Sequence, residues 1–138
     1  MGTRVAYASQ VLLPAYRFDE YLAVMGTLFA PAVHYVDPVH ELHDREAVLA
    51  MLAKYVPRAA NDKFRFELLV DEPTRVFWKW TIVIQLRIGR YVFTINGLVH
   101  ADVRDGLIVY QREYYDPMES IGVIPFIGRG YKKLLQMG

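Results

Sequence analysis

A single α+β domain, with helices packed on one face of a curved antiparallel sheet, is the fold that the sequence predicts. Two observations lead to it. In the first half of the chain, apolar residues recur every three or four positions, which is typical of amphipathic helices. From Asn61 onward they recur every second position in long runs of β-branched and aromatic residues, which is typical of strands. Helices first and neighbouring strands second indicate an α+β arrangement.

The composition agrees with one compact domain over residues 1–138, without internal repeats or linkers. The 16 Lys and Arg residues nearly balance the 15 Asp and Glu residues, so we expect no nucleic-acid partner. The absence of cysteine excludes disulfides and thiolate chemistry and favours a cytoplasmic location. No apolar run reaches the roughly 18 residues that a membrane span needs, and the N-terminus lacks the continuous apolar segment of a signal peptide.

Three helical segments are expected in the first half. The second has Asp19 near its start, and Pro31 is expected to end it. The third is expected to stop before Pro57, because proline brings no backbone N–H to a helix interior. A short strand, Ala32–Val36, and a loop reading DPVHELHD stand between these two helices. The predicted helices are Val5–Leu13, Phe18–Phe29 and Arg45–Tyr55.

Four long strands are expected in the second half. The sequence IGRY supplies a glycine turn between the second and the third strand. Asp105–Gly106 is a strong signal for a tight hairpin between the third and the fourth. Short turns between successive strands predict antiparallel pairing. The predicted strands are Phe64–Leu68, Arg75–Ile88, Arg90–Asp102 and Leu107–Tyr115.

Four stretches resemble the nuclear transport factor 2-like superfamily, which includes ketosteroid isomerase, limonene epoxide hydrolase and the SnoaL-like polyketide cyclases. They read LFAPAVHYVDPVH, DREAV, FTINGLVHADV and RDGLIVYQREYYDP, and the match runs from about Phe18 to Pro117. The resemblance implies a cystatin-like cone, in which a strongly bent antiparallel sheet wraps the N-terminal helices around an apolar cavity. It also implies a homodimer that pairs through the outer face of the sheet. The superfamily contains isomerases, hydrolases, cyclases and binding modules, so the fold alone assigns no reaction.

The tripeptide Asp37–Pro38–Val39 matches the isomerase branch, in which this Asp is the general base. Pro38 biases Asp37 toward an extended backbone at a strand end, and partial desolvation above an apolar cavity would suit a base. The alternative is that Asp37 only ends the strand by accepting a backbone hydrogen bond in the loop. His40 lies near enough to orient Asp37 or to share a proton with a ligand.

The histidines of the DPVHELHD loop do not predict a metal site. His40 and His43 could be combined with Asp37, Glu41 and Asp44 as ligands. The spacing has no helical i, i+4 geometry, however, and no second cluster obviously completes the set. We therefore expect solvated loop histidines and no metal or other cofactor.

Glu113 is the second candidate carboxylate. The stretch QREYYD aligns with the hydrolase branch and places Glu113 where that enzyme has a catalytic Asp facing the cavity. A carboxylate opposite Asp37 would provide an acid and a base in one cavity. The alternative is an ion pair of Glu113 with Arg112 or Arg75.

The candidate ligand-binding residues lie on the predicted strands, with one on the N-terminal segment. The Arg and Asp that the hydrolase needs on the long middle strand are replaced by Trp78 and Trp80. The protonated acid of the isomerase falls at or near Val99, and Tyr16 is the nearest match for its helix tyrosine. His100 faces a ligand only if the strand bulges, and otherwise lies on the opposite face. The candidates are Tyr16, Trp78, Trp80, Ile82, Val99, His100, Gln111 and Tyr115.

The tail, residues 118–138, carries more apolar residues than an exposed terminus requires. We expect a lid over the open mouth of the cone, or alternatively a contact with a partner chain or a membrane surface. The residues that need a cover are Ile121, Val123, Ile124, Phe126 and Ile127.

These observations predict an isomerase-like or hydrolase-like enzyme that acts by acid–base chemistry on a small hydrophobic compound and needs no cofactor. Asp37 would be the base and Glu113 its partner or the general acid. The alternative is a non-catalytic module that binds an apolar ligand or a partner chain.

Overall fold

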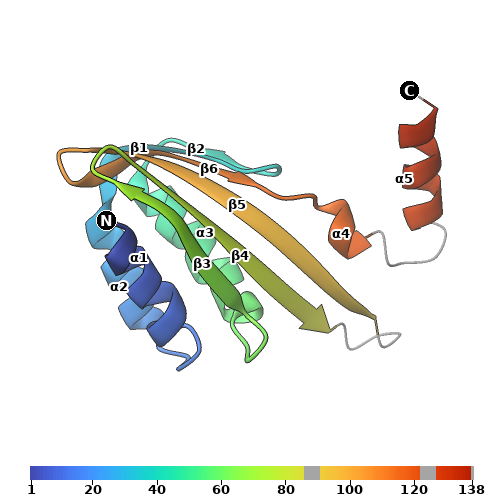
Figure 1. The fold of residues 1–138 in the computed structure, drawn as a ribbon, viewed down its shortest axis with the longest axis horizontal. Helices are drawn as coiled ribbons and strands as arrows, with labels where there is room; N and C mark the ends of the chain where they lie inside the picture. The colour runs from blue at the N-terminus through green and yellow to red at the C-terminus, as the bar shows by residue number, and fades with distance from the viewer. Residues whose placement is uncertain (86–90, 122–126, 138) are drawn as a thin grey trace.

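A curved six-stranded sheet wraps the N-terminal helices in the computed structural model (Figure 1). The structure describes residues 1–85, 91–121 and 127–137. The strand order is β2-β1-β6-β5-β4-β3, and neighbours are antiparallel except for β1 and β6, which run parallel. The N-terminal helices cover one face, so the predicted α+β fold is confirmed.

The helices and strands have the following bounds. The first half contains α1 (Gly2–Tyr7), the π-helical η1 (Ala8–Leu12), α2 (Phe18–Leu28), β1 (Phe29–Val36), β2 (Glu41–Leu42) and α3 (Arg45–Ala59). The second half contains β3 (Arg65–Glu72), β4 (Arg75–Gln85), β5 (Val92–Arg104), β6 (Leu107–Tyr114), α4 (Met118–Ile121) and α5 (Ile127–Gln136).

Both prolines that were expected to end helices lie inside elements. Helix α2 ends at Leu28, and Pro31 is part of β1, where the pairing with β6 is irregular between Phe29 and His34. A proline fits there because the irregular stretch does not need its missing N–H. Pro57 lies in the last turn of α3, where the end of the helix is exposed to water. The prediction that α3 stops before Pro57 was wrong.

The predicted hairpin between β5 and β6 is present. Asp105 and Gly106 both have positive φ, 52° and 75°, as a type I′ turn requires. The predicted end of β4 at Ile88 and the predicted start of β5 at Arg90 lie outside the described residues. The short strand β2 was not expected. It pairs with the end of β1 and lies within DPVHELHD, which we interpreted as a loop.

The core lies between the helices and the inner face of the sheet. Side chains alternate along each strand, so only every second residue faces the helices. Fully buried side chains come from both layers: Val5, Leu12 and Leu28 from the helices, and Phe29, Val33, Tyr35, Val76, Val99 and Ile108 from the strands. No helix within the described part of the chain is long and apolar enough to cross a bilayer.

The C-terminal segment extends beyond the sheet. Glu119 of α4 accepts hydrogen bonds from the backbone N of Asn96, at 3.0 Å, and from its side chain, which ties α4 to β5. Helix α5 stands apart from the sheet (Figure 1), and Leu134 and Leu135 on it, together with Met137 just after it, are exposed. The side chains of Ile121, Val123, Ile124, Phe126 and Ile127 lie outside the described residues, so the lid or interface role of residues 118–138 stays a prediction.

Candidate functional site

The parallel pairing of β1 with β6 brings Asp37 and Glu113 together. Tyr35 lies opposite Gln111 in this pair, and Val36 lies opposite Arg112. Asp37 directly follows the end of β1, and Glu113 continues β6 from that register. Glu113 also pairs with Val99 on the buried face of β5, so its side chain points toward the helices. We call Asp37 and Glu113 the acid pair.

Asp37 is surrounded by hydrogen-bond donors. Its Oδ1 accepts from the backbone N–H groups of Val39, at 2.8 Å, and His40, at 2.7 Å. Its Oδ2 accepts from the hydroxyl of Tyr35 and from Nδ1–H of His40, both at 3.0 Å. Only 4% of the Asp37 side chain is exposed. This is the loop-closing role that the sequence left open as the alternative, and it coexists with proximity to Glu113.

Glu113 has an altered proton affinity. Burial raises the pKa of its carboxyl to about 7, and the negative charge of Asp37 contributes to the shift. Hydrogen bonds from Tyr35 and from Gln111, whose Nε2 lies 3.3 Å from Oε1, act in the opposite direction. Glu113 therefore exchanges between its neutral and charged forms near neutral pH.

The hydroxyl of Tyr35 connects the two carboxyl groups. Its single proton is donated either to Asp37, whose Oδ2 lies 3.0 Å away, or to the charged form of Glu113. Burial raises the pKa of Tyr35, and the charges of Glu113 and Asp37 raise it further, so the hydroxyl stays protonated. When Glu113 is neutral, it can donate to Tyr35 while Tyr35 donates to Asp37. Sequence reasoning missed Tyr35, although it stands two residues before Asp37 and therefore on the same face of the strand.

Two further tyrosines lie near the acid pair. Burial raises the pKa of Tyr21, on α2, with a further contribution from Glu113. Burial also raises the pKa of Tyr115, followed by the charges of Asp37 and then Glu113. Both phenols are therefore protonated donors. The sequence pattern places Tyr21 on the apolar face of its helix. Such a pattern does not show that Tyr21 lies near Glu113, which is on a distant strand.

Aromatic rings form the wall beside the acid pair. Trp78 and Val99 are buried and lie in register with Glu113 across β4, β5 and β6. Trp80 lies over Gly97 in the next register position, where a Cβ would come within 2.2 Å of the ring. The Trp80 ring is 5.7 Å from that of Tyr115. An apolar ligand reaching Glu113 from this side would meet flat ring surfaces.

The family model described as the SnoaL-like domain matches residues 19–111, which run from α2 into β6. The chain belongs to the SnoaL-like family. This confirms the resemblance to the nuclear transport factor 2-like superfamily that the sequence stretches indicated. Comparison with the curated proteins gives no significant match.

Solved structures share the fold of this SnoaL-like domain. A protein of Jannaschia sp. CCS1, provisionally named a SnoaL-like polyketide cyclase, has a TM-score of 0.65 and 12% identity over 90% of this chain and 93% of its own. A provisionally named isomerase of Bacillus subtilis has a TM-score of 0.60 and 14% identity over 90% and 97%. A provisionally named polyketide cyclase of Xanthomonas campestris pv. campestris has a TM-score of 0.57 and 23% identity over 89% and 96%. Identities this low show the fold alone.

The other predicted site residues of the SnoaL-like domain divide between the two faces of the sheet. Gln111 is buried beside Glu113, and its Oε1 has no hydrogen-bond partner among the described residues. Ile82 is partly buried farther along β4. His100 lies on the outer face, with its Nε2 2.9 Å from Asp102 and its ring stacked on Phe77.

Tyr16 is exposed on the surface of the SnoaL-like domain. It lies in the turn after η1, with a positive φ of 56°, and its ring meets Phe18 edge-on. Its side chain is thus not brought to the acid pair. The helix tyrosine whose pKa is raised by the charge of Glu113 is Tyr21 instead.

The two arginines that we considered as partners of Glu113 have other contacts. Arg75 donates to Glu72 at 3.0 Å. Arg112 lies on the outer face, with its guanidinium over the ring of Tyr114. The ion-pair alternative for Glu113 therefore has no support from these two residues.

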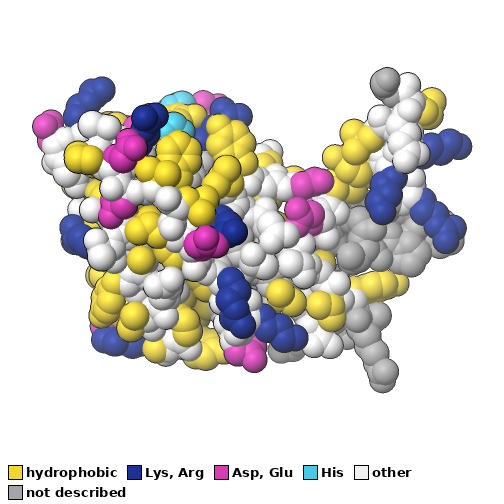
Figure 2. Space-filling model, in the orientation of Figure 1, with side chains coloured by type: hydrophobic (Ala, Val, Ile, Leu, Met, Phe, Trp, Pro, Cys, Tyr) yellow, Lys and Arg dark blue, Asp and Glu magenta, His cyan; other side chains and the backbone are white. Residues whose placement is uncertain are grey.

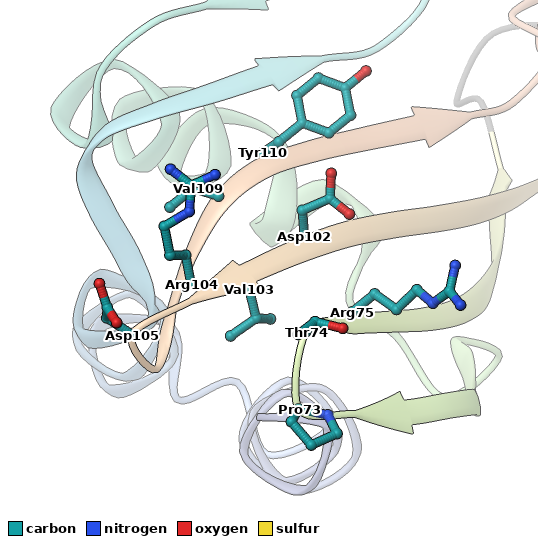
Figure 3. A pocket seen from close by; sticks show the side chains of 9 residues that line it. All are labelled: Pro73, Thr74, Arg75, Asp102, Val103, Arg104, Asp105, Val109 and Tyr110. Atoms are coloured by element: carbon teal, nitrogen blue, oxygen red, sulfur yellow. The ribbon is translucent and has the colours of Figure 1, made fainter.

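A hollow of about 690 Å³ opens at the end of the sheet where the β3–β4 turn approaches β5 and β6 (Figure 3). Its lining includes neither Asp37 nor Glu113. Four of its nine lining residues are charged, so it differs from the apolar cavity that the resemblance implies, and that cavity stays a prediction. The lining residues are Pro73, Thr74, Arg75, Asp102, Val103, Arg104, Asp105, Val109 and Tyr110.

Proposed function

We propose that this SnoaL-like domain catalyses proton transfer on a small, apolar carbonyl compound, with Glu113 as the group that takes and returns the proton. The observation that carries the proposal is the acid pair itself. Two carboxyl groups from distant parts of the chain share the hydroxyl of Tyr35, and one of them has its pKa raised to about 7. A base with a pKa near the working pH is the one that general acid–base catalysis favours.

The hydrogen bonds favour Glu113 over Asp37 as the proton carrier. A carboxylate has about four lone-pair positions. Four donors already occupy those of Asp37, namely two backbone N–H groups, the His40 ring and Tyr35. We therefore assign Asp37 as the fixed anion that holds Tyr35 and His40 and helps to raise the pKa of Glu113. This differs from the sequence hypothesis, in which Asp37 was the base.

The surrounding groups suit an enolate-type intermediate. In the proposed step, the C–H bond next to the carbonyl breaks, the proton moves to a Glu113 oxygen, and the electron pair moves onto the carbonyl oxygen. Returning the proton to another carbon of the conjugated enolate completes an isomerisation. In a cyclisation, the enolate carbon instead forms a bond to a second carbonyl carbon, and the oxygen of that carbonyl takes the proton back from Glu113. Tyr21 and Tyr115 are protonated phenols that can donate to the developing oxyanion.

Deuterium exchange tests the proposal whatever the final product of the reaction. A panel of small apolar ketones, enones and lactones is incubated with the protein in D₂O, and incorporation next to the carbonyl is followed by mass spectrometry. We expect enzyme-dependent incorporation that Glu113→Gln abolishes. The matched control is Glu67→Gln, because Glu67 is exposed and pairs with Lys79 at 2.9 Å. Exchange that survives Glu113→Gln would contradict the assignment.

A non-catalytic binding module is the second candidate function. The observation that favours it is the tight loop around Asp37, which explains that residue without chemistry. In that case, a ligand from the panel would stabilise the wild type and Glu113→Gln alike in thermal unfolding, and no exchange would occur.

We also propose that the domain is a homodimer through the outer face of the sheet. Leu98 and Tyr114 are cross-strand partners there and are 41% and 51% exposed. An apolar pair so exposed in the middle of a sheet supports contact with a second copy.

A further inference from the structure

Three metal-ligating side chains gather at the edge of the sheet formed by β1 and β2, on the face opposite to the acid pair: His34, Glu41 and His43. The hairpin register explains why they meet. Tyr35 lies opposite Leu42 and Val36 opposite Glu41, so continuing the same register brings His34 opposite His43. Residues 34, 36, 41 and 43 then share one face of the hairpin, because side chains alternate along a strand.

The ligand atoms are already close to one another. His34 Nε2 lies 3.0 Å from Glu41 Oε1, and His43 Nε2 lies 3.9 Å from the same oxygen. One ligand atom from each of the three residues lies within 4.8 Å of the other two. Around a tetrahedral zinc ion, with bonds of about 2.0–2.2 Å, ligand atoms are roughly 3.3–3.6 Å apart. The observed separations bracket that value, and the nearly parallel rings of His34 and His43 must turn toward each other for both nitrogens to point at one ion.

Neighbouring contacts keep the three side chains close to one another. The rings of His34 and His43 stack with their centroids 4.7 Å apart, and Tyr110 meets His34 edge-on at 5.3 Å. His43 is followed directly by Asp44, whose side chain caps α3 by accepting from the N–H of Ala47 at 2.7 Å. The backbone on both sides of His43 is therefore fixed, on one side by the β-hairpin and on the other by the helix cap.

The three side chains are open to solvent. Histidine and acidic side chains reach the surface side by side where β1 and β2 run (Figures 1 and 2). The exposed fractions are 39% for His34, 61% for Glu41 and 70% for His43.

We propose that His34, Glu41 and His43 bind one divalent transition-metal ion of the zinc class. Two imidazole nitrogens and one carboxylate oxygen are ligands that Zn²⁺ and its neighbours in the first transition row accept. Water would complete the coordination, because no fourth protein ligand belongs to the group within the described residues. The site would join β1 to the start of α3. The sequence did not predict it, because we interpreted DPVHELHD as a loop and did not consider His34 as a ligand.

Metal titration of the full-length chain, without a polyhistidine tag and after removal of metals by a chelator, tests this site. Co²⁺ is followed by the visible absorption of the bound ion, and Zn²⁺ by calorimetry. We expect one equivalent to bind. His34→Ala and His43→Ala should each weaken binding by at least about tenfold. Glu41→Gln, which keeps the shape of the side chain, should weaken it as well.

His100→Ala is the matched control, because His100 is another outer-face histidine next to a carboxylate, Asp102. It should bind like the wild type. Since His43 is the most exposed of the three ligands, His43→Ala is expected to fold normally, which circular dichroism checks. Failure of the wild type to bind either ion at millimolar concentration would overturn the proposal. Binding that is unchanged in both histidine variants would overturn it too.

Discussion

At the scale of single residues, the two carboxyl groups of the acid pair have different surroundings. Asp37 is satisfied by four donors, whereas Glu113 contacts Tyr35 and Gln111 in a partly buried position that disfavours its charge. The raised pKa of Glu113 links its charge to the stability of the fold. A move from 4.5 to about 7 corresponds to about 3 kcal/mol between the two protonation states.

The first prediction concerns Glu113→Gln and stability. Because the folded-state pKa lies above the unfolded value, the contribution of Glu113 to the stability of the wild type is fully present below pH 4.5 and is lost as the pH rises to about 7. Glu113→Gln has no carboxyl to ionise at this position, so it should not lose stability over this pH range. Urea unfolding should give similar free energies of unfolding at pH 4.5, whereas at pH 8 the variant should be more stable by up to about 3 kcal/mol. Glu67→Gln, at an exposed ion pair, should change stability by under about 1 kcal/mol at both pH values.

The second prediction concerns Asp37→Asn and its effect on Glu113. The variant removes the charge that contributes to the raised pKa of Glu113, while burial, the larger cause, remains. The pKa should therefore fall below 7 but stay above 4.5. Carboxyl-carbon NMR on ¹³C-glutamate-labelled protein measures it directly. If the protein catalyses deuterium exchange, the midpoint of the pH dependence of the exchange rate should move to lower pH by the same amount. An unchanged pKa would show that the two groups do not interact.

At the scale of elements, close packing between neighbouring strands shapes the wall of the site. Gly97 of β5 leaves room for the Trp80 ring of β4, which in turn approaches Tyr115. No ordinary side chain fits at residue 97, because even a Cβ would come within 2.2 Å of the ring.

The third prediction is that Gly97→Ala destabilises the domain by about 1–3 kcal/mol, since the Trp80 ring must leave its position. Tryptophan fluorescence should change together with the free energy of unfolding. Gly106→Ala is a useful contrast. Gly106 has open space around it, so Gly106→Ala should lose stability only through its positive φ. The tryptophan fluorescence should stay unchanged.

The elements also show what the sequence could predict. Periodicity found the main helices and strands, and Asp105–Gly106 found the β5–β6 hairpin, because these signals are local. The short strand β2 and the continuation of α3 through Pro57 were missed, since the first depends on pairing with β1 and the second on surroundings that tolerate a proline. The convergence of Asp37 and Glu113 was expected only from the resemblance. Their link through Tyr35 depends on the β1–β6 register, which no local pattern reveals.

At the scale of the whole molecule, the two faces of the sheet carry different groups. The inner face carries the core and the acid pair. The outer face carries the exposed pair Leu98 and Tyr114, the His100–Asp102 contact and the three proposed metal ligands. Assembly and metal binding would thus be separated from the chemistry by the thickness of one sheet.

The fourth prediction tests the proposed dimer. Leu98→Asp adds a charge opposite Tyr114 and should convert the dimer to a monomer in size-exclusion chromatography with light scattering. Val11→Asp is the control, because Val11 is 47% exposed on η1, on the helical side of the molecule. That variant should remain dimeric. A wild-type protein that is already monomeric would remove the basis for the prediction.

The parallel contact between β1 and β6 has a consequence for the order of folding. It joins residues separated by more than half of the chain, whereas the pairings of β3 with β4, β4 with β5 and β5 with β6 join close neighbours. Closing so long a loop loses the most chain entropy, so the local hairpins should form first. A nascent or partly refolded chain would then have formed most of its sheet before Asp37 and Glu113 come together. The proposed proton transfer would become possible only when β1 pairs with β6.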